Sequence, residues 1–166
     1  MAQAGLAIDR IGSPGVPPPG LSAGVLAAPM PEGAPRATDS ARPLRVLIVE
    51  DELIIAWEIA ELLVRLGCEV CGTAADAMQA IRLAGELAPD LVLMDVRLRG
   101  KGDGITAAEA IRAQQPVSLV FCTAHAEDPV TRARMQAAGA VAILAKPIEP
   151  GALEETLIRL TGSMPA

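Results

Sequence analysis

Short apolar runs alternate with amphipathic stretches from Leu44 onward, and no other feature limits the possible folds as strongly. The apolar runs occupy residues 45–49, 69–73, 91–95, 117–123 and 141–145. The stretches that follow them have helical spacing, at about residues 53–66, 77–87, 105–114, 129–138 and 151–160. Strands that are apolar on both faces and alternate with helices indicate a parallel sheet covered on both sides. The sequence therefore predicts a doubly wound α/β domain with five parallel strands over residues 44–162.

The first helical stretch carries six apolar residues near helical spacing and ends at Gly67. They are Leu53, Ile54, Trp57, Ala60, Leu63 and Leu66. We expect this stripe to face the sheet, with Trp57 in the core or on a partly covered face of the helix. Asp76 is the predicted N-cap of the next helix.

Residues 1–43 differ in composition from the rest of the chain. The first 40 positions hold seven of the 14 prolines and six of the 15 glycines, and their apolar residues follow no fixed period. We interpret the segment as a disordered or loosely attached extension. A functional tail and an over-long assignment of the start codon both stay open. Residues 163–166 form a short tail after the domain.

The charge balance and the scarcity of aromatic residues argue against several classes of partner. Asp and Glu (20) outnumber Lys and Arg (14), with a net charge of −6, whereas a nucleic-acid surface needs clustered cations. Trp57 and Phe121 are the only aromatic residues, so platforms for base stacking are missing. No stretch approaches the ~18 consecutive apolar residues of a membrane span. We expect neither nucleic acid nor a membrane as a partner.

Three cysteines, Cys68, Cys71 and Cys122, accompany a start that lacks the pattern of a signal peptide. The first two spell C-x-x-C, but residues i and i+3 on a strand lie roughly 10 Å apart on opposite faces, too far for a disulfide. Zinc needs more ligands, and His125 is the only histidine. We interpret the cysteines as buried free thiols in a reducing cytoplasm.

Polar residues gather where the predicted strands end. The first strand is followed by Glu50 and Asp51, the third ends in Asp95, the fourth ends in Thr123, and Lys146 follows the fifth. In an open parallel sheet these ends meet at one edge, where ligands bind. Neighbouring carboxylates repel one another, and an all-oxygen ligand set suits Mg²⁺ or Mn²⁺. A carboxylate nucleophile beside a metal, with an ammonium and a hydroxyl for the phosphoryl oxygens, is suited to forming an aspartyl-phosphate.

Each of these residues alone has an ordinary explanation. Two adjacent acids favour a helix N-terminus. Asp95 could end its strand in a turn, Thr123 could be a simple strand former, and Lys146 could be a solvated charge. Their joint placement favours one site.

This constellation resembles the receiver domain of response regulators in two-component signalling, over about residues 44–160. The matching residues are Glu50-Asp51, Asp95, Thr123-Ala124 and Lys146-Pro147. The resemblance implies a flavodoxin-like sheet with the strand order 2-1-3-4-5. It also implies a phosphoprotein that is no enzyme beyond its own phosphorylation and autodephosphorylation.

The resemblance also implies a metal site. Asp95 would be the phosphoacceptor. Asp51 and Asp95 would bind the metal directly, together with the backbone carbonyl of Arg97, and Glu50 would hold a metal-bound water. The cofactor would be Mg²⁺ or Mn²⁺.

The remaining site residues would act on the phosphoryl group. Lys146 would contact this group and the acidic cluster, and Thr123 would be the switch hydroxyl. Arg97 and His125, two positions past the acceptor and two past the switch hydroxyl, would tune dephosphorylation.

Several positions depart from the family pattern. Arg99 stands where a proline is frequent, and the loop to Asp103 is one residue longer than usual. Ile143 occupies the position of an aromatic switch residue. Residues 121–125 (F-C-T-A-H) partly resemble the Phe-x-Thr-x-Tyr receiver subgroup, with His125 in place of tyrosine.

The function implied is that of a stand-alone, cytoplasmic, bacterial response regulator in a phosphorelay. The phosphoryl donor would be a histidine kinase or a histidine phosphotransfer protein. No output domain is expected after the final helix, so the output would be protein–protein contact or onward phosphotransfer, a homodimer through the fourth helix, fifth strand and fifth helix included. A pseudo-receiver adaptor that acts without phosphorylation is one alternative. An aspartyl-phosphate phosphatase is another, although the second acid of its D-x-D motif is replaced by Arg97.

Overall fold

The computed structural model describes residues 42–162, in which strands and helices alternate throughout. The strands are β1 (Arg45–Val49), β2 (Glu69–Ala74), β3 (Leu91–Asp95), β4 (Ser118–Thr123) and β5 (Ala140–Ala145). The helices are α1 (Leu53–Arg65), α2 (Ala77–Leu87), α3 (Gly104–Gln114), α4 (Pro129–Ala137) and α5 (Pro150–Thr161). Each predicted strand and helix is therefore present. The expected extension falls outside the described residues except for residues 42 and 43, and the tail 163–166 falls outside entirely.

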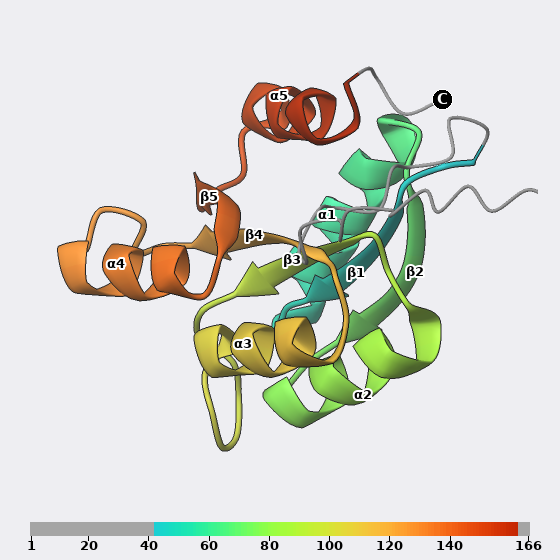
Figure 1. Cartoon of the computed structure of the whole chain (residues 1–166). Helices are drawn as coiled ribbons and strands as arrows, with labels where there is room; N and C mark the ends of the chain where they lie inside the picture. Colours follow the sequence, from blue (N-terminus) through green and yellow to red (C-terminus); the bar gives the residue numbers. More distant parts are fainter. Residues whose placement is uncertain (1–41, 163–166) are drawn as a thin grey trace, which may run out of the picture. The chain divides into compact units, whose positions relative to one another are not determined.

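The five strands form one parallel sheet in the order β2-β1-β3-β4-β5 (Figure 1). The predicted fold class is confirmed, including the flavodoxin-like strand order. The chain runs from β1 outward to β2 and then returns to the other side of β1 with β3. Ligands of such sheets bind at the carboxyl ends of the strands where this direction reverses, which places Glu50, Asp51 and Asp95 at the switch point.

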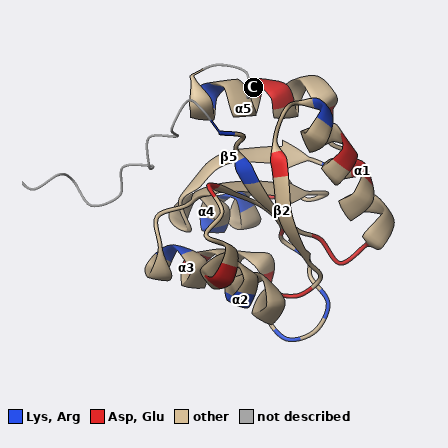
Figure 2. Cartoon of the chain, turned by 90° about the vertical axis from the view of Figure 1, so that its right-hand side faces the viewer, with Lys and Arg blue, Asp and Glu red and all other residues tan. Residues whose placement is uncertain are grey.

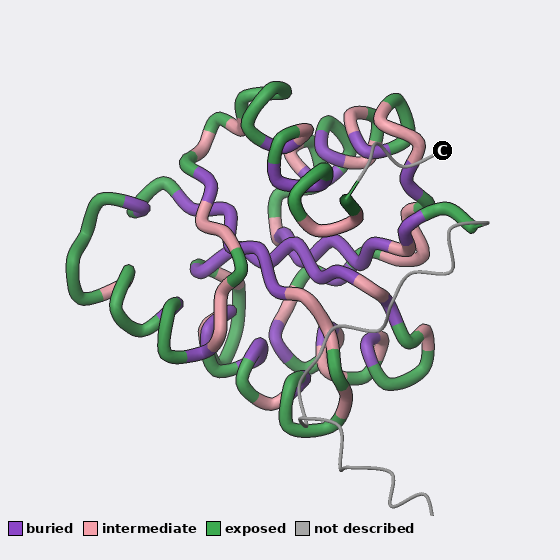
Figure 3. The backbone as a smooth tube through the Cα atoms, turned by 45° about the horizontal axis from the view of Figure 1, so that its top comes forward, coloured by how far each residue is buried: buried purple, intermediate pink, exposed green. Residues whose placement is uncertain are grey.

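Helices cover the two faces of the sheet and enclose two hydrophobic clusters. On β1, Leu47 and Val49 pack with α2, α3 and α4, whereas Val46 and Ile48 pack with α1 and α5. This alternation follows from the period of two in a strand. Figure 3 shows the result as continuously buried segments through the centre of the sheet. Both faces are apolar because both are covered, as the unbroken apolar runs predicted.

The face that α1 presents to the sheet differs from the prediction. The buried residues are Ala56, Ile59 and Leu63, whereas Leu53, Ile54 and Trp57 are 83%, 73% and 62% exposed. Of the predicted stripe, only Leu63 is buried. The helix is apolar on more than one side, so spacing alone did not decide which side meets the sheet. Trp57 is therefore not a core residue: it lies on a partly covered face of the helix, with most of its surface in solvent.

The start of α3 is pressed against the end of β3. Asp103 caps the helix, and its carboxylate accepts a hydrogen bond from the backbone N–H of Thr106 at 2.8 Å. A Cβ atom on Gly104 would lie 1.8 Å from the carbonyl oxygen of Asp95. Only glycine allows this approach, so α3 fixes the position of the strand end that carries Asp95. Asp76 caps α2 in the same way, as predicted.

All three cysteines are free, with Cys68 and Cys122 buried and Cys71 half-buried. Burial raises the pKa of Cys68 to about 11 and that of Cys122 to about 12. These thiols are therefore protonated at neutral pH and act as small apolar core residues. Within residues 42–162, no helix is both long enough and apolar enough to cross a membrane.

Candidate functional site

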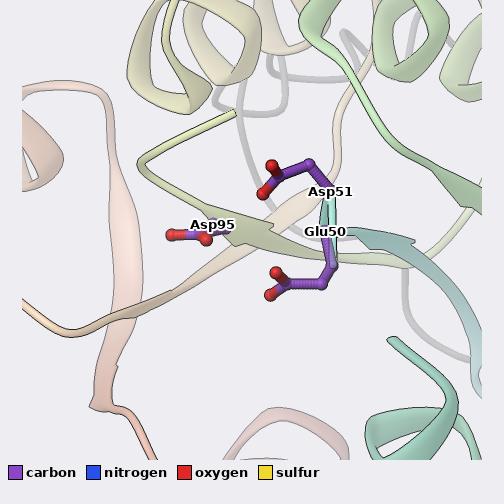
Figure 4. A group of neighbouring side chains, drawn as sticks. All are labelled: Glu50, Asp51 and Asp95. Atoms are coloured by element: carbon purple, nitrogen blue, oxygen red, sulfur yellow. The ribbon is translucent and has the colours of Figure 1, made fainter. Parts of the chain in front are cut away.

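Three carboxylates converge at the carboxyl edge of the sheet. Glu50 and Asp51 follow β1, Asp95 ends β3, and Figure 4 shows their carboxylates pointing toward a common space. One oxygen of each lies within 4.8 Å of the others. Glu50 and Asp95 are 4% and 7% exposed. Carboxylates this close and this buried require positive charge nearby.

Lys146, which follows β5, supplies part of that charge. Its Nζ donates hydrogen bonds to Glu50 Oε2 at 2.5 Å and to Asp95 Oδ2 at 2.7 Å. Burial by itself would lower the pKa of Lys146, but the two carboxylates outweigh burial and raise it. Lys146 therefore remains charged. Glu50 and Asp95 thus meet at the ammonium group of Lys146, although they lie 96 and 51 positions before it in the sequence.

Burial of Glu50 changes its protonation equilibrium. Burial raises the pKa of its carboxyl group, and the hydrogen bond from Lys146 offsets this only in part. The contact between Lys146 and Glu50 therefore outweighs burial for one partner only. Lys146 has two carboxylates to stabilise its charged form, whereas Glu50 has a single ammonium group. Glu50 also accepts a hydrogen bond from the backbone N–H of Glu52 at 3.3 Å, which orients its side chain toward the cluster.

Asp95 and Thr123 are both held by the backbone two residues further along the chain. Asp95 Oδ1 accepts a hydrogen bond from the N–H of Arg97 at 3.1 Å, and the buried Thr123 Oγ1 accepts one from the N–H of His125 at 3.1 Å. Arg97 Nη2 also lies 2.7 Å from His125 Nε2. The two predicted tuning residues thus touch each other, a contact that the sequence did not indicate.

The site residues open into a single cleft. Its lining is Asp51, Glu52, Asp95, Arg97, Leu98, Arg99, Thr123, Ala124, His125 and Lys146. Glu50 is buried and is not part of this lining, but it accepts a hydrogen bond from Lys146, which is. The structure therefore brings together all seven residues that the sequence proposed, although their roles stay predictions.

Arg99 is an additional residue of the site, which in the sequence stands out only as a departure from the family pattern. Its Nε donates a hydrogen bond to Asp51 Oδ2 at 2.9 Å. The side chain of Arg99 is 75% exposed, whereas that of Asp51 is 16% exposed. A basic residue four positions past the acceptor, in a chain with an acidic cluster, was the signal for this contact.

The donor set fits a hard divalent cation. Asp51 and Asp95 offer carboxylate oxygens from two neighbouring strand ends, and Glu50 adds a third carboxylate. Mg²⁺ and Mn²⁺ prefer such oxygen ligands. Among residues 42–162, the group whose ligand atoms lie this close together holds carboxylates alone, with no cysteine or histidine.

The β5 position expected to hold an aromatic switch residue carries Ile143. It pairs in register with Phe121 of β4 and is half-buried against the cluster on the α2–α4 face. In Figure 2, Lys and Arg are interspersed with Asp and Glu over the described helices and loops.

Comparisons with known proteins agree with this fold. The model of the response regulator receiver domain matches residues 46–158. The transcriptional regulatory protein PdtaR of Mycobacterium tuberculosis is 46% identical over 110 residues, which cover 66% of this chain and 52% of that protein. A protein-glutamate methylesterase/protein-glutamine glutaminase of Anaeromyxobacter dehalogenans is 35% identical over 134 residues, which cover 76% of this chain and 36% of that protein.

A solved structure is similar over nearly its whole length. The receiver domain of the PhyR response regulator from Erythrobacter litoralis has a TM-score of 0.65 at 30% identity and covers 75% of this chain and 95% of that one. The chain spans about half the length of PdtaR and about a third of the methylesterase. The chain belongs to the response regulator receiver domain family of two-component signalling.

Proposed function

We propose that Asp95 accepts a phosphoryl group, with Mg²⁺ as cofactor, from a histidine kinase or a histidine phosphotransfer protein. The observation that carries this proposal is the position of its carboxylate. It is buried at the end of β3, bonded to Lys146, next to two further acids, and it lines an open cleft. An isolated structural Asp would need neither the acidic neighbours nor the cleft.

The transfer requires only bond exchange at phosphorus. A carboxylate oxygen of Asp95 forms the new O–P bond, the P–N bond of the donor phosphohistidine breaks, and its electron pair stays on the imidazole. The Nζ atom of Lys146 lies 2.7 Å from Asp95 Oδ2 and would neutralise negative charge on the phosphoryl oxygens. Bound Mg²⁺ would supply further neutralisation, held by Asp51, Asp95 and the carbonyl of Arg97, with Glu50 on a bound water.

The output that we propose is a change in protein–protein contacts. Thr123 Oγ1 now accepts from the N–H of His125, and its own hydroxyl proton would bond a phosphoryl oxygen on Asp95. That bond would pull on the segment between β4 and α4. We propose that this movement changes the surface formed by α4, β5 and α5, which would serve as a homodimer contact or as a docking face. Stand-alone action stays a prediction.

The test is the intact mass of the full chain after incubation with acetyl phosphate, with and without Mg²⁺. We expect one phosphoryl adduct that needs Mg²⁺ and is absent from Asp95→Asn. Thr123→Ala is the companion variant, since it should keep the adduct and lose any change in partner binding. An adduct that persists in Asp95→Asn would refute the assignment. A folded protein that binds Mg²⁺ but gains no adduct would favour the pseudo-receiver adaptor instead.

A further inference from the structure

Two cationic side chains neutralise the three carboxylates, and they differ sharply in exposure. Lys146 is 15% exposed and bonds Glu50 and Asp95. Arg99 is 75% exposed, and within residues 42–162 its hydrogen bond and ion pair are both with Asp51. Removing Lys146 would leave two buried carboxylates without a partner, which is costly. Moving Arg99 into water would cost little, because exposed ion pairs contribute little net free energy.

The backbone holds Arg99 at the mouth of the site even though its side chain is exposed. Arg99 forms an isolated parallel β-bridge with Asp76, the N-cap of α2. Gly100 and Gly102, which follow it, have φ values of +88° and +96°, where glycine is favoured. The chain therefore pins this position and turns away after it. The contact with Asp51 is a consequence of where the loop places residue 99.

Asp51 is the carboxylate that a divalent cation would share with Asp95. A cation bound at Asp51 would stand close to the guanidinium group, which lies 2.9 Å from Oδ2. Two like charges beside one carboxylate repel each other. Lys146 and Arg99 both neutralise the cluster, but only Arg99 is exposed enough for its side chain to move into solvent.

We propose that Arg99 is an internal competitor for the divalent cation. It neutralises Asp51 while the site is free of metal, and it moves into solvent when the cation binds. The metal affinity of the domain is therefore set in part by Arg99. This inference rests on the proposed function, because it concerns the same metal site, and it adds a residue outside the ligand set that determines metal affinity.

The direct test is titration calorimetry of MgCl₂ into the full chain. Arg99→Gln removes the competing charge, so we expect Mg²⁺ to bind about two- to fivefold more tightly than to the native protein. Lys101→Gln is the matched control. Lys101 is exposed in the same loop and takes part in none of the hydrogen bonds or ion pairs found among residues 42–162. An equal gain in Lys101→Gln would show general electrostatics and overturn the inference.

A second measurement observes the ion pair itself. The Nε–H resonance of Arg99 in a ¹H–¹⁵N spectrum, assigned by its loss in Arg99→Gln, should shift toward that of a solvated arginine as Mg²⁺ is added. Backbone amides near Asp95 should shift over the same concentrations. If those amides respond while the Arg99 resonance stays in place, the side chain does not leave and the inference is wrong.

The outcomes also separate this inference from the function on which it rests. Mg²⁺ binding with equal affinity in the native protein and in Arg99→Gln would overturn the competition alone and leave the phosphoacceptor proposal intact. Absence of Mg²⁺ binding in both proteins, with folding verified by circular dichroism, would overturn both.

Discussion

Helices α3 and α4 follow neighbouring strands, lie on the same face of the sheet and are attached to it in different ways. The buried residues of α3 are Gly104, Ile105, Ala107, Ala108 and Ile111. In α4 the buried residue is Met135, and Figure 3 draws that helix largely as exposed. Both helices begin at a capping aspartate, Asp103 and Asp128. Packing, and not the local helix signal, therefore distinguishes them.

This difference separates what must stay fixed from what can move. Helix α3 begins against the carbonyl of Asp95 and holds the acceptor in place. Helix α4 follows Thr123 and is tied to α3 by two polar contacts, from Arg134 to Asp103 and from Arg112 to the carbonyl of Ala138. Elements with few buried apolar contacts open at low free energy. The proposed switch thus lies in the more weakly attached helix.

Gly104→Ala should disrupt the attachment of α3 to the end of β3 and cause the largest loss of stability. Because its Cβ would meet the Asp95 carbonyl at 1.8 Å, we expect a loss of at least about 4 kcal/mol in the free energy of unfolding. Urea unfolding followed by far-UV circular dichroism measures it. Gly151→Ala is the matched control, since a Cβ there meets nothing within 4 Å. Equal stability of the two variants would contradict the close approach.

Ile111→Ala in α3 and Met135→Ala in α4 compare how firmly each helix is attached to the sheet. Both side chains are 0% exposed, but α4 has more freedom to collapse onto the space left behind. We expect a loss of about 3 kcal/mol for Ile111→Ala and about 2 kcal/mol for Met135→Ala. Amide hydrogen exchange should accelerate across the whole domain in the first variant and mainly in α4 in the second. Uniform acceleration in both would mean that α4 is no separate unit.

Asp103→Asn weakens the ion pair with Arg134 and keeps a capping side chain, so its effect is the smallest. Burial tends to raise the pKa of Asp103, but hydrogen bonds from Thr106 and Arg134 outweigh it and lower the pKa below 3.8. A lowered pKa stabilises the folded state above 3.8, and this contribution is lost as the pH falls through the folded-state value. At pH 7 we expect a loss of about 0.5 kcal/mol, reduced by solvent screening.

The measurement is urea unfolding of the native protein and of Asp103→Asn from pH 7 downward. The difference in stability should shrink as the pH falls below 3.8, and exchange in α4 should rise at neutral pH. Glu86→Gln breaks a comparable pair inside α2, with Arg82, and should leave α4 unaffected. A difference that grows toward acid pH would reverse the assigned sign.

The sheet and the acidic edge followed from the sequence because both depend on simple periodicity and topology. Unbroken apolar runs indicated strands buried on both faces, and parallel strands bring their carboxyl ends to one edge. Glu50, Asp95 and Lys146 could therefore be placed together without any knowledge of side-chain conformation. The structure adds that one ammonium bonds both acids.

The contacts that the sequence did not indicate depend on loop conformation or on a choice among faces. The pairs Arg99–Asp51 and Arg97–His125 join long side chains whose positions follow from the backbone of residues 96–103. That backbone turns at two glycines with positive φ, which no periodic pattern encodes. In α1, apolar residues lie on several sides of the helix, so their spacing did not single out Ala56 and Ile59 as the residues that face the sheet.

The exposure of Trp57 has a consequence for spectroscopy. It is the only tryptophan in a chain without tyrosine, and 62% of its surface meets solvent in the folded domain. Its emission is therefore already close to that of the unfolded chain, and fluorescence follows denaturation poorly. The same indole lies on the outer side of α1, beside the exposed Leu53 and Ile54. Its emission should shift to the blue when a partner covers that helix, so the protein carries a native optical reporter of docking and not of unfolding.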